Sequence, residues 1–247
     1  MPARKKKVQR LPREVVAFRS GDKQGAEERW DVDRCRDLCA FPAPARILLL
    51  GPPGVGKTVM AKNILIHGRP RYDEFYVIHE DGGVSRDYED CDATAIMNEV
   101  PSLDFWSALP ERHESGPRKG RRIKRLVVVD DLETGGASKE RIKRLGILVR
   151  YASSHKFLTV VICHQSPMDL PPLIRKLSNV WVVWRPRGRN EIALIENRVG
   201  ADRGELEHLF NTVATGPRDS ICIDETFGTP CRLRLNRVTP IELVDDP

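Results

Sequence analysis

A glycine-rich segment at residues 51–58 carries the residue types that bind a nucleoside triphosphate. Its sequence, GPPGVGKT, matches the pattern G-x-x-x-x-G-K-[ST] in full, after a strand-like apolar run and before a helical pattern. The glycines permit backbone torsions in which successive N–H groups converge on phosphate oxygens. Lys57 is predicted to neutralise the β- and γ-phosphates, and the Thr58 hydroxyl to bind Mg²⁺. The predicted nucleotide-binding residues are Gly51, Pro52, Pro53, Gly54, Val55, Gly56, Lys57, Thr58 and Val59.

Two consecutive carboxylates, Asp130 and Asp131, follow the apolar run at residues 126–129. In open α/β sheets the carboxyl ends of the strands face the ligand, so both carboxylates are expected on the phosphate side. Asp130 is predicted to hold Mg²⁺ through its water shell, and Asp131 to orient or deprotonate the attacking water. Glu133 is the competing candidate for the base. An Asp-Asp pair after a strand can also be only a turn and a helix cap.

A third polar cluster, His164-Gln165-Ser166, ends the apolar run at residues 158–163. A polar side chain at this strand end would face the γ-phosphate region and report whether phosphate is present. Gln165 is the predicted sensor. His164 is the alternative, although a buried, hydrogen-bonded histidine is the commoner outcome, and no zinc or nucleophile constellation supports a catalytic part for it.

Apolar runs of strand length alternate with helical patterns from about residue 45 onward. This alternation predicts an α/β fold: parallel β-α-β units in a twisted sheet with helices on both faces. The expected strands are residues 47–50, 75–79, 126–129, 158–163 and 180–184, and the expected helices are residues 57–67, 138–154, 191–198 and 203–213. Residues 220–224 and 232–235 flank a turn signal and predict a C-terminal β-hairpin. Residues 102–124 are expected to form an exposed loop.

A length of 247 residues permits one large α/β domain. We expect a basic N-terminal tail and lead-in at residues 1–44 and a P-loop ATPase domain at residues 45–247. The six cysteines show no C-x-x-C pair and no zinc-ligand spacing, which favours reduced thiols in a cytosol-like compartment. No apolar run approaches the ~20 residues of a membrane span, and the N-terminus lacks the apolar stretch of a secretory signal. The sequence therefore predicts a soluble protein that is not secreted and does not contact membranes.

Positive charge is unevenly distributed along the chain, although 41 basic and 35 acidic residues leave a formal net charge of only +6. One basic cluster lies in the N-terminal tail, at residues 4–13, and the other at residues 118–125. Such runs can contact a nucleic-acid phosphate backbone, and the tail can also be a nuclear address. A solvated tail and a solvated loop are the alternative interpretation.

Together these residues resemble the FtsK-HerA superfamily, and within it the genome-packaging ATPases of large eukaryotic DNA viruses, typified by the poxviral enzyme. The resemblance rests on the P-loop at residues 51–58, on a strand that ends in Asp-Asp rather than Asp-Glu, and on a following strand that ends in the Gln165 sensor. It covers roughly residues 45–235. Two features depart from the family pattern: the basic insertion between the first two motifs and the spacing of Arg175 from Asn179.

The resemblance implies an ATP-hydrolysing, Mg²⁺-dependent translocase that packages double-stranded DNA into a capsid. It implies a homo-oligomeric ring, expected as a hexamer, in which a neighbouring subunit supplies an arginine to each ATP. Arg175 is the first candidate for this arginine, and the others are Arg185, Arg187 and Arg189. DNA would pass through the ring and be held through its phosphates. Capsid proteins are further implied partners, and the expected location is the virion or the host cytoplasm or nucleus.

Three other classes of protein share some of these motifs. An AAA+ helicase loader or transposition-associated ATPase can have the same P-loop, but that class normally adds a helical lid, and the segment after Trp184 is short. A GTPase would carry an Asn-Lys-x-Asp guanine signature, which is absent. A structural capsid protein with an inactive site is disfavoured because Lys57, Thr58 and Asp130 are intact.

Overall fold

The computed structural model describes residues 6–10, 44–67, 72–80, 88, 91–132, 138–226, 232–237 and 239–245. These residues form one sheet of ten strands in the order β1-β10-β9-β8-β7-β2-β6-β5-β3-β4. The strands are β1 (Lys6–Arg10), β2 (Arg46–Leu50), β3 (Glu74–His79), β4 (Ala95–Met97), β5 (Arg125–Asp130), β6 (Leu158–His164), β7 (Val180–Trp184), β8 (Ser220–Asp224), β9 (Leu233–Leu235) and β10 (Thr239–Asp245). The helices are α2 (Lys57–His67), α3 (Leu103–Ala108), α4 (Lys139–Ile147), the π-helical segment η2 (Leu148–Ala152), α5 (Ser153–His155), α6 (Pro172–Leu177), α7 (Arg189–Val199) and α8 (Glu205–Thr212).

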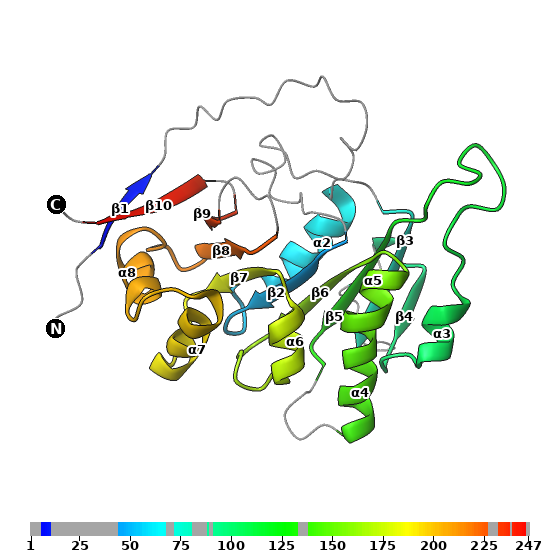
Figure 1. The fold of residues 1–247 in the computed structure, drawn as a ribbon, viewed down its shortest axis with the longest axis horizontal. Coiled ribbons are helices and arrows are strands. Elements are labelled where there is room, and N and C mark those ends of the chain that lie inside the picture. The colour runs from blue at the N-terminus through cyan, green and yellow to red at the C-terminus, as the bar shows by residue number, and fades with distance from the viewer. Residues whose placement is uncertain are drawn as a thin grey trace.

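The sheet has a parallel half and an antiparallel half (Figure 1). From β7 through β2, β6, β5 and β3 to β4 every neighbouring pair is parallel, and from β7 to β1 every neighbouring pair is antiparallel. Strands β8 and β9 pair with Ile221 opposite Leu235. The α/β fold with a parallel sheet and a C-terminal β-hairpin, predicted from the alternation of strand and helix patterns, is therefore confirmed.

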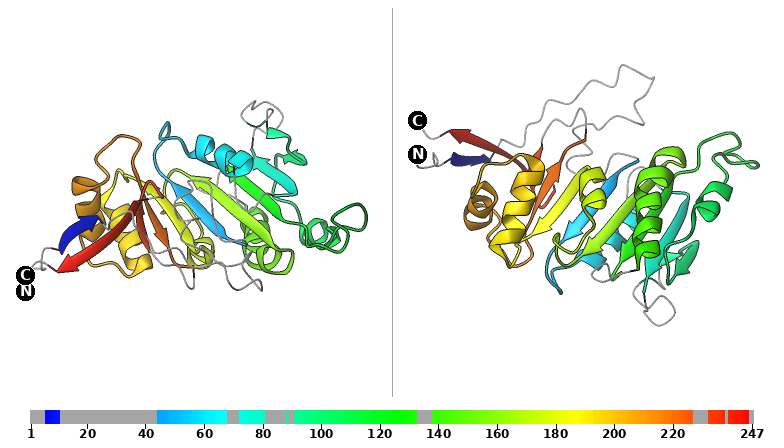
Figure 2. Two further views of the ribbon diagram at one scale, coloured as in Figure 1. Left: turned by 90° about the horizontal axis from the view of Figure 1, so that it is seen from above. Right: turned by 60° about the horizontal axis from the view of Figure 1, so that its bottom comes forward.

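Helices cover both faces of the sheet, and each face has its own apolar core (Figure 2). On one face α2 packs through Ala61 and Ile64 against the strands. On the other face the helices from α4 to α8 pack through residues such as Leu145, Ile174 and Phe210. Because both faces are covered, β5 and β7 are buried along their whole length, which explains why they read as continuous apolar runs.

The segment at residues 102–124, expected to be an exposed loop, begins instead with helix α3. Trp106 of this helix is fully buried and lies edge-on to Phe105, with ring centroids 5.0 Å apart. The expectation was wrong here because a helix of six residues is too short to produce a recognisable period. Arg125, which the sequence groups with the basic cluster, is also fully buried and donates to Glu74, so it belongs to the sheet.

The two ends of the described chain meet in one pair of strands. Strand β1 pairs antiparallel with β10, with Val8 opposite Leu243, and the two strands lie side by side in Figure 1. The sequence predicts only a basic tail for this region. A pairing between strands more than 200 residues apart leaves no local pattern, so only the folded chain reveals it. The division into residues 1–44 and 45–247 stays a prediction.

Candidate active site

The P-loop joins β2 to α2 and has the backbone shape that its glycines permit. Gly54 and Gly56 have φ angles of +80° and +105°, and a Cβ added at either position would meet nothing within 4 Å. Glycine is therefore needed at these two positions for the torsion angle, not for packing. At Gly51 the reason is different, because a Cβ would lie 2.7 Å from the Cβ of Trp184. The amide of Gly51 donates to the carbonyl of His164 at 3.2 Å, which ties the loop to β6.

Lys57, the first residue of α2, folds its side chain back over the P-loop. Its Nζ donates to the carbonyl oxygens of Gly51 at 2.7 Å and Pro52 at 3.0 Å. Burial lowers the pKa of the Lys57 ammonium, and the neighbouring carboxylates of Asp130 and Asp131 oppose that shift. The ammonium of Lys57 is thus held against its own loop by hydrogen bonds to neutral carbonyl oxygens. Phosphate oxygens can take the place of these carbonyl oxygens as acceptors.

Asp130, the last residue of β5, is 4% exposed and accepts hydrogen bonds from two hydroxyl groups. Its Oδ2 lies 2.8 Å from the Thr58 hydroxyl and 2.7 Å from the Tyr88 hydroxyl. Burial, followed by the charge of Asp130, raises the pKa of the Cys163 thiol well above its usual range, so Cys163 remains protonated. A buried carboxylate with this many donors has a fixed orientation.

The residues predicted to bind magnesium fit that ion. The Thr58 hydroxyl oxygen and a carboxylate oxygen of Asp130 are 2.8 Å apart, and both are hard oxygen ligands of the kind that Mg²⁺ prefers. In the described part of the chain no three residues among His, Cys, Asp and Glu gather into a metal-binding group. Mg²⁺ in nucleotide sites typically takes one or two protein ligands, several waters and substrate phosphates, so two protein oxygens suit it.

Asp131 differs from Asp130 in both exposure and backbone. Its side chain is exposed, and its φ angle of +50° lies in the left-handed region that non-glycine residues rarely adopt. Aspartate tolerates this region better than most residues, but such a conformation is more often found at functional sites than elsewhere. The backbone therefore turns directly after the buried Asp130 and leaves the next carboxylate at the edge of the sheet. Glu133, the competing base, lies outside the described residues.

The two sensor candidates occupy different environments after β6. The Nδ1 atom of His164 lies 2.8 Å from the carbonyl oxygen of Ser166, and burial lowers the pKa of the His164 ring. The ring of His164 therefore helps to shape the turn. Gln165 is exposed at the carboxyl end of the strand, where the sensor was predicted.

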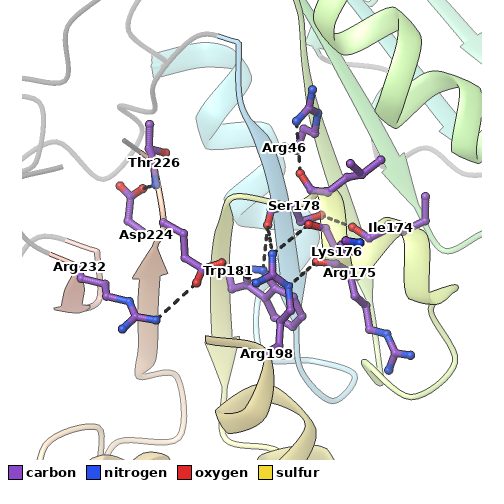
Figure 3. A network of polar contacts seen from close by, with 12 residues as sticks. Arg46, Ile174, Arg175, Lys176, Ser178, Trp181, Arg198, Asp224, Thr226 and Arg232 are labelled. Atoms are coloured by element: carbon purple, nitrogen blue, oxygen red, sulfur yellow. Dashed lines mark hydrogen bonds and ion pairs between the residues drawn. The ribbon is translucent and has the colours of Figure 1, made fainter. Parts of the chain in front are cut away.

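Arg175 lies on α6, where Arg198 contacts its backbone (Figure 3). Its Nη1 donates to the carbonyl oxygen of Pro167 at 3.1 Å. Arg198 of α7 holds the end of α6 by donating to the carbonyls of Arg175 at 3.1 Å and Lys176 at 3.0 Å, and it pairs with Glu225 at 3.1 Å. These contacts hold Arg175 and the end of α6 against the loop that follows β6 and against α7.

The other arginine candidates follow β7. Arg185 is engaged within its own chain, because Nη2 donates to the carbonyl of Phe210 and, at 2.8 Å, to Oδ1 of Asn211. Arg187 and Arg189 are exposed at the start of α7. Of the three, Arg187 and Arg189 are therefore better placed than Arg185 to reach a second molecule.

Tyr88 is the site residue that the sequence did not reveal, since no motif surrounds it. It is 2% exposed, and its ring centroid lies 6.3 Å from that of Phe75, while its hydroxyl reaches Asp130. Groups that orient a metal-binding carboxylate typically contribute 10- to 100-fold to metal affinity or activity. Tyr88→Phe is thus expected to reduce turnover or Mg²⁺ affinity by about 10- to 100-fold, measured as ATP hydrolysis across a Mg²⁺ titration.

Tyr76→Phe is the matched control for Tyr88→Phe. It also removes one hydroxyl hydrogen bond to a carboxylate, the 2.8 Å bond to Glu74, but at the other end of the parallel strands. Equal Mg²⁺ dependence in the two variants would contradict the positioning role of Tyr88.

Comparison with known proteins identifies the fold through structure rather than sequence. No protein-family model and no curated protein matches the chain. The genome-packaging NTPase B204 of Sulfolobus turreted icosahedral virus 2, in complex with sulfate, matches with a TM-score of 0.54 and 16% identity over 78% of this chain and 96% of that one. The same viral protein in complex with ATP-γS matches with a TM-score of 0.52 and 14% identity, with the same coverage. ATPases 2 and 3 of Thermomonospora curvata EccC match with a TM-score of 0.50 and 15% identity over 83% of this chain and 37% of that one.

These neighbours show that the chain has the fold of a viral genome-packaging NTPase. The P-loop NTPase fold expected from the resemblance is therefore confirmed. No described helix is both long and apolar enough to cross a membrane.

Proposed function

We propose that this protein is an ATP-hydrolysing DNA translocase that packages a double-stranded viral DNA genome into a capsid. The observation that carries the proposal is the convergence of the P-loop, through Lys57 and Thr58, with the buried carboxylate of Asp130. This cluster lies at one edge of a fold that a viral genome-packaging NTPase shares. ATP with Mg²⁺ is the proposed cofactor pair.

Each residue of the cluster has a proposed part in hydrolysis. The N–H groups of residues 54–59, which include the start of α2, bind the phosphates, and Lys57 exchanges its two carbonyl contacts for the β- and γ-phosphates. The Thr58 hydroxyl binds Mg²⁺ and Asp130 holds the ion through its water shell; the ion, when bound, neutralises charge on those phosphates. Asp131 orients the attacking water or accepts its proton, and Gln165 contacts the γ-phosphate as a sensor.

The proposed active form is a homo-oligomeric ring, which we expect to be a hexamer, with one ATP at each subunit boundary. A neighbouring subunit supplies an arginine to the charge that develops on the γ-phosphate. Arg175 remains the first candidate, because its contact with Pro167 and the contact of Arg198 with its backbone hold it against the loop that follows β6. Arg187 and Arg189 are the alternatives, since they are exposed.

The proposed partners are double-stranded DNA and capsid proteins, and the proposed location is the virion or the host cytoplasm or nucleus. Kinship with the poxviral type of packaging enzyme belongs to the same proposal. The AAA+ helicase loader remains the alternative function. After β7 the described chain forms only α7 and α8 before it returns to the sheet with β8, which favours the packaging motor because a separate helical lid is not seen there.

ATP turnover with and without linear double-stranded DNA tests this proposal. We expect DNA to raise the turnover rate, and electron microscopy with ATP and DNA to show rings. Protein that binds ATP but hydrolyses none, with or without DNA and in every assembly state, would contradict the motor function. Turnover that responds only to a partner ATPase, and never to DNA, would favour the helicase-loader alternative.

A further inference from the structure

Residues 111–123 form a β-hairpin that leads into β5. The backbone amide of His113 donates to the carbonyl of Arg121 at 2.9 Å, and that of Gly120 donates to His113 at 2.8 Å. Arg112 and Arg122 form an antiparallel bridge, and the amide of Ile123 donates to the carbonyl of residue 111 at 3.0 Å. The tip turns through Gly116 and Gly120, whose φ angles are +75° and +77°. The basic insertion is therefore an ordered structural element.

Side-chain contacts anchor the hairpin to the sheet. The carboxylate of Asp73 forms an ion pair with Arg118 and accepts a hydrogen bond from the amide of Lys124 at 2.9 Å. The guanidinium of Arg122 lies 4.7 Å above the centre of the Phe157 ring, and Ile123 is only 4% exposed. The hairpin therefore has a defined direction relative to the sheet.

The hairpin concentrates positive charge that the protein neutralises only in part, through the ion pair of Arg118 with Asp73. Residues 111–124 include six lysines and arginines but only two glutamates, a formal charge of +4. The carboxylate of Glu111 lies 3.7 Å from the ammonium of Lys156, which is outside the hairpin. Part of the negative charge of the hairpin is therefore offset by a lysine elsewhere in the chain. In the part of the chain that the structure describes, Lys119 and Arg121 are exposed and make no ion pair. These two side chains are free to bind an external anion.

The hairpin and the nucleotide cluster lie at opposite ends of the parallel strands. The hairpin enters β5 at Arg125, whereas Asp130 ends the same strand. At about 3.3 Å per residue, five steps along β5 separate these ends by about 17 Å. Figures 1 and 2 show the hairpin, in green, projecting beyond α3 and β3 at the end of the molecule. A ligand on the hairpin would therefore not compete with ATP.

We propose that the hairpin at residues 111–123 grips the phosphate backbone of double-stranded DNA, with Lys119 and Arg121 as contact residues. The inference rests on the proposed function, which supplies DNA as the partner. A sequence-independent translocase needs contacts to phosphates rather than to base edges, and two unpaired cations on a rigid projection provide them. Because the grip lies away from Asp130, DNA affinity and ATP hydrolysis in the absence of DNA are separable properties.

The double variant Lys119→Ala/Arg121→Ala tests the grip. DNA affinity is measured by fluorescence anisotropy with a labelled duplex over a range of salt concentrations. The slope of log K against log salt is negative, and each lost phosphate contact makes it less steep by about 0.9. We therefore expect the slope to become less steep by about 1.8. ATP turnover without DNA stays at the wild-type rate.

Two further variants control for charge and for folding. Arg150→Ala/Arg203→Ala removes the same charge from exposed positions on η2 and before α8, and keeps the wild-type slope. Lys119→Arg/Arg121→Lys restores the slope, because phosphate contact requires charge rather than one side chain. An unchanged slope in Lys119→Ala/Arg121→Ala, while the wild-type protein binds DNA, would overturn the hairpin inference alone. Failure of the wild-type protein to bind DNA at low salt would overturn the hairpin inference and the proposed function together.

Discussion

Replacing Lys57 by alanine is expected to reduce ATP hydrolysis by about 100- to 1000-fold, the typical loss when one preorganised charge at a transition state is removed. The side chain bonds only to carbonyls of its own loop, so its loss leaves the sheet and both apolar cores intact. The thermal midpoint should therefore change little. Phosphate release under saturating ATP, together with a melting curve, measures both quantities.

Lys62→Ala is the matched control for Lys57→Ala, since it removes a lysine from the same helix, α2, farther from the P-loop. We expect this control to retain turnover. If Lys57→Ala hydrolysed ATP at the wild-type rate, the assignment of the P-loop as the catalytic nucleotide site would be wrong.

Replacing Asp131 by asparagine is expected to reduce the turnover number by about 100- to 10,000-fold, the usual contribution of a general base. The substitution keeps the size of the side chain and its tolerance of the left-handed backbone at φ +50°, but it removes the charge that attracts a proton. Because Asp131 is exposed and Asp130 holds the contacts to Thr58 and Tyr88, ATP affinity should remain close to that of the wild type. Single-turnover hydrolysis and equilibrium ATP binding separate the two effects.

Glu133→Gln provides the comparison that decides between the two candidate bases. We expect Glu133→Gln to retain most of the turnover. The opposite pattern, with activity lost in Glu133→Gln and kept in Asp131→Asn, would transfer the base role to Glu133.

The strands and the loop that form the nucleotide site were predictable because the residues that mark each of them are close together in the sequence. Strands β2, β5 and β6 are buried on both faces, so each reads as a continuous apolar run, and a turn or polar pair ends each run. The P-loop needs glycine at fixed spacing, which leaves a motif in the sequence. The proximity of Thr58 to Asp130 then follows from the parallel order of the strands.

The remaining elements depend on contacts between distant parts of the chain. The pairing of β1 with β10 joins the two ends of the described chain, and β4 has only three residues. Tyr88 reaches Asp130 across 42 positions of sequence, with no motif to mark it. The basic hairpin was expected to be an exposed loop because the residues that anchor it, Asp73 and Phe157, lie far from it in the sequence.

ATP-dependent movement along duplex DNA is the central claim, and triplex displacement tests it most directly. A fluorescent third strand is annealed near one end of a linear duplex, and its release is followed after ATP is added. We predict that the wild-type protein displaces the third strand only with ATP and Mg²⁺, and that Lys57→Ala does not displace it. Wild-type protein that hydrolyses ATP in the presence of DNA yet leaves the third strand in place would contradict the translocase function.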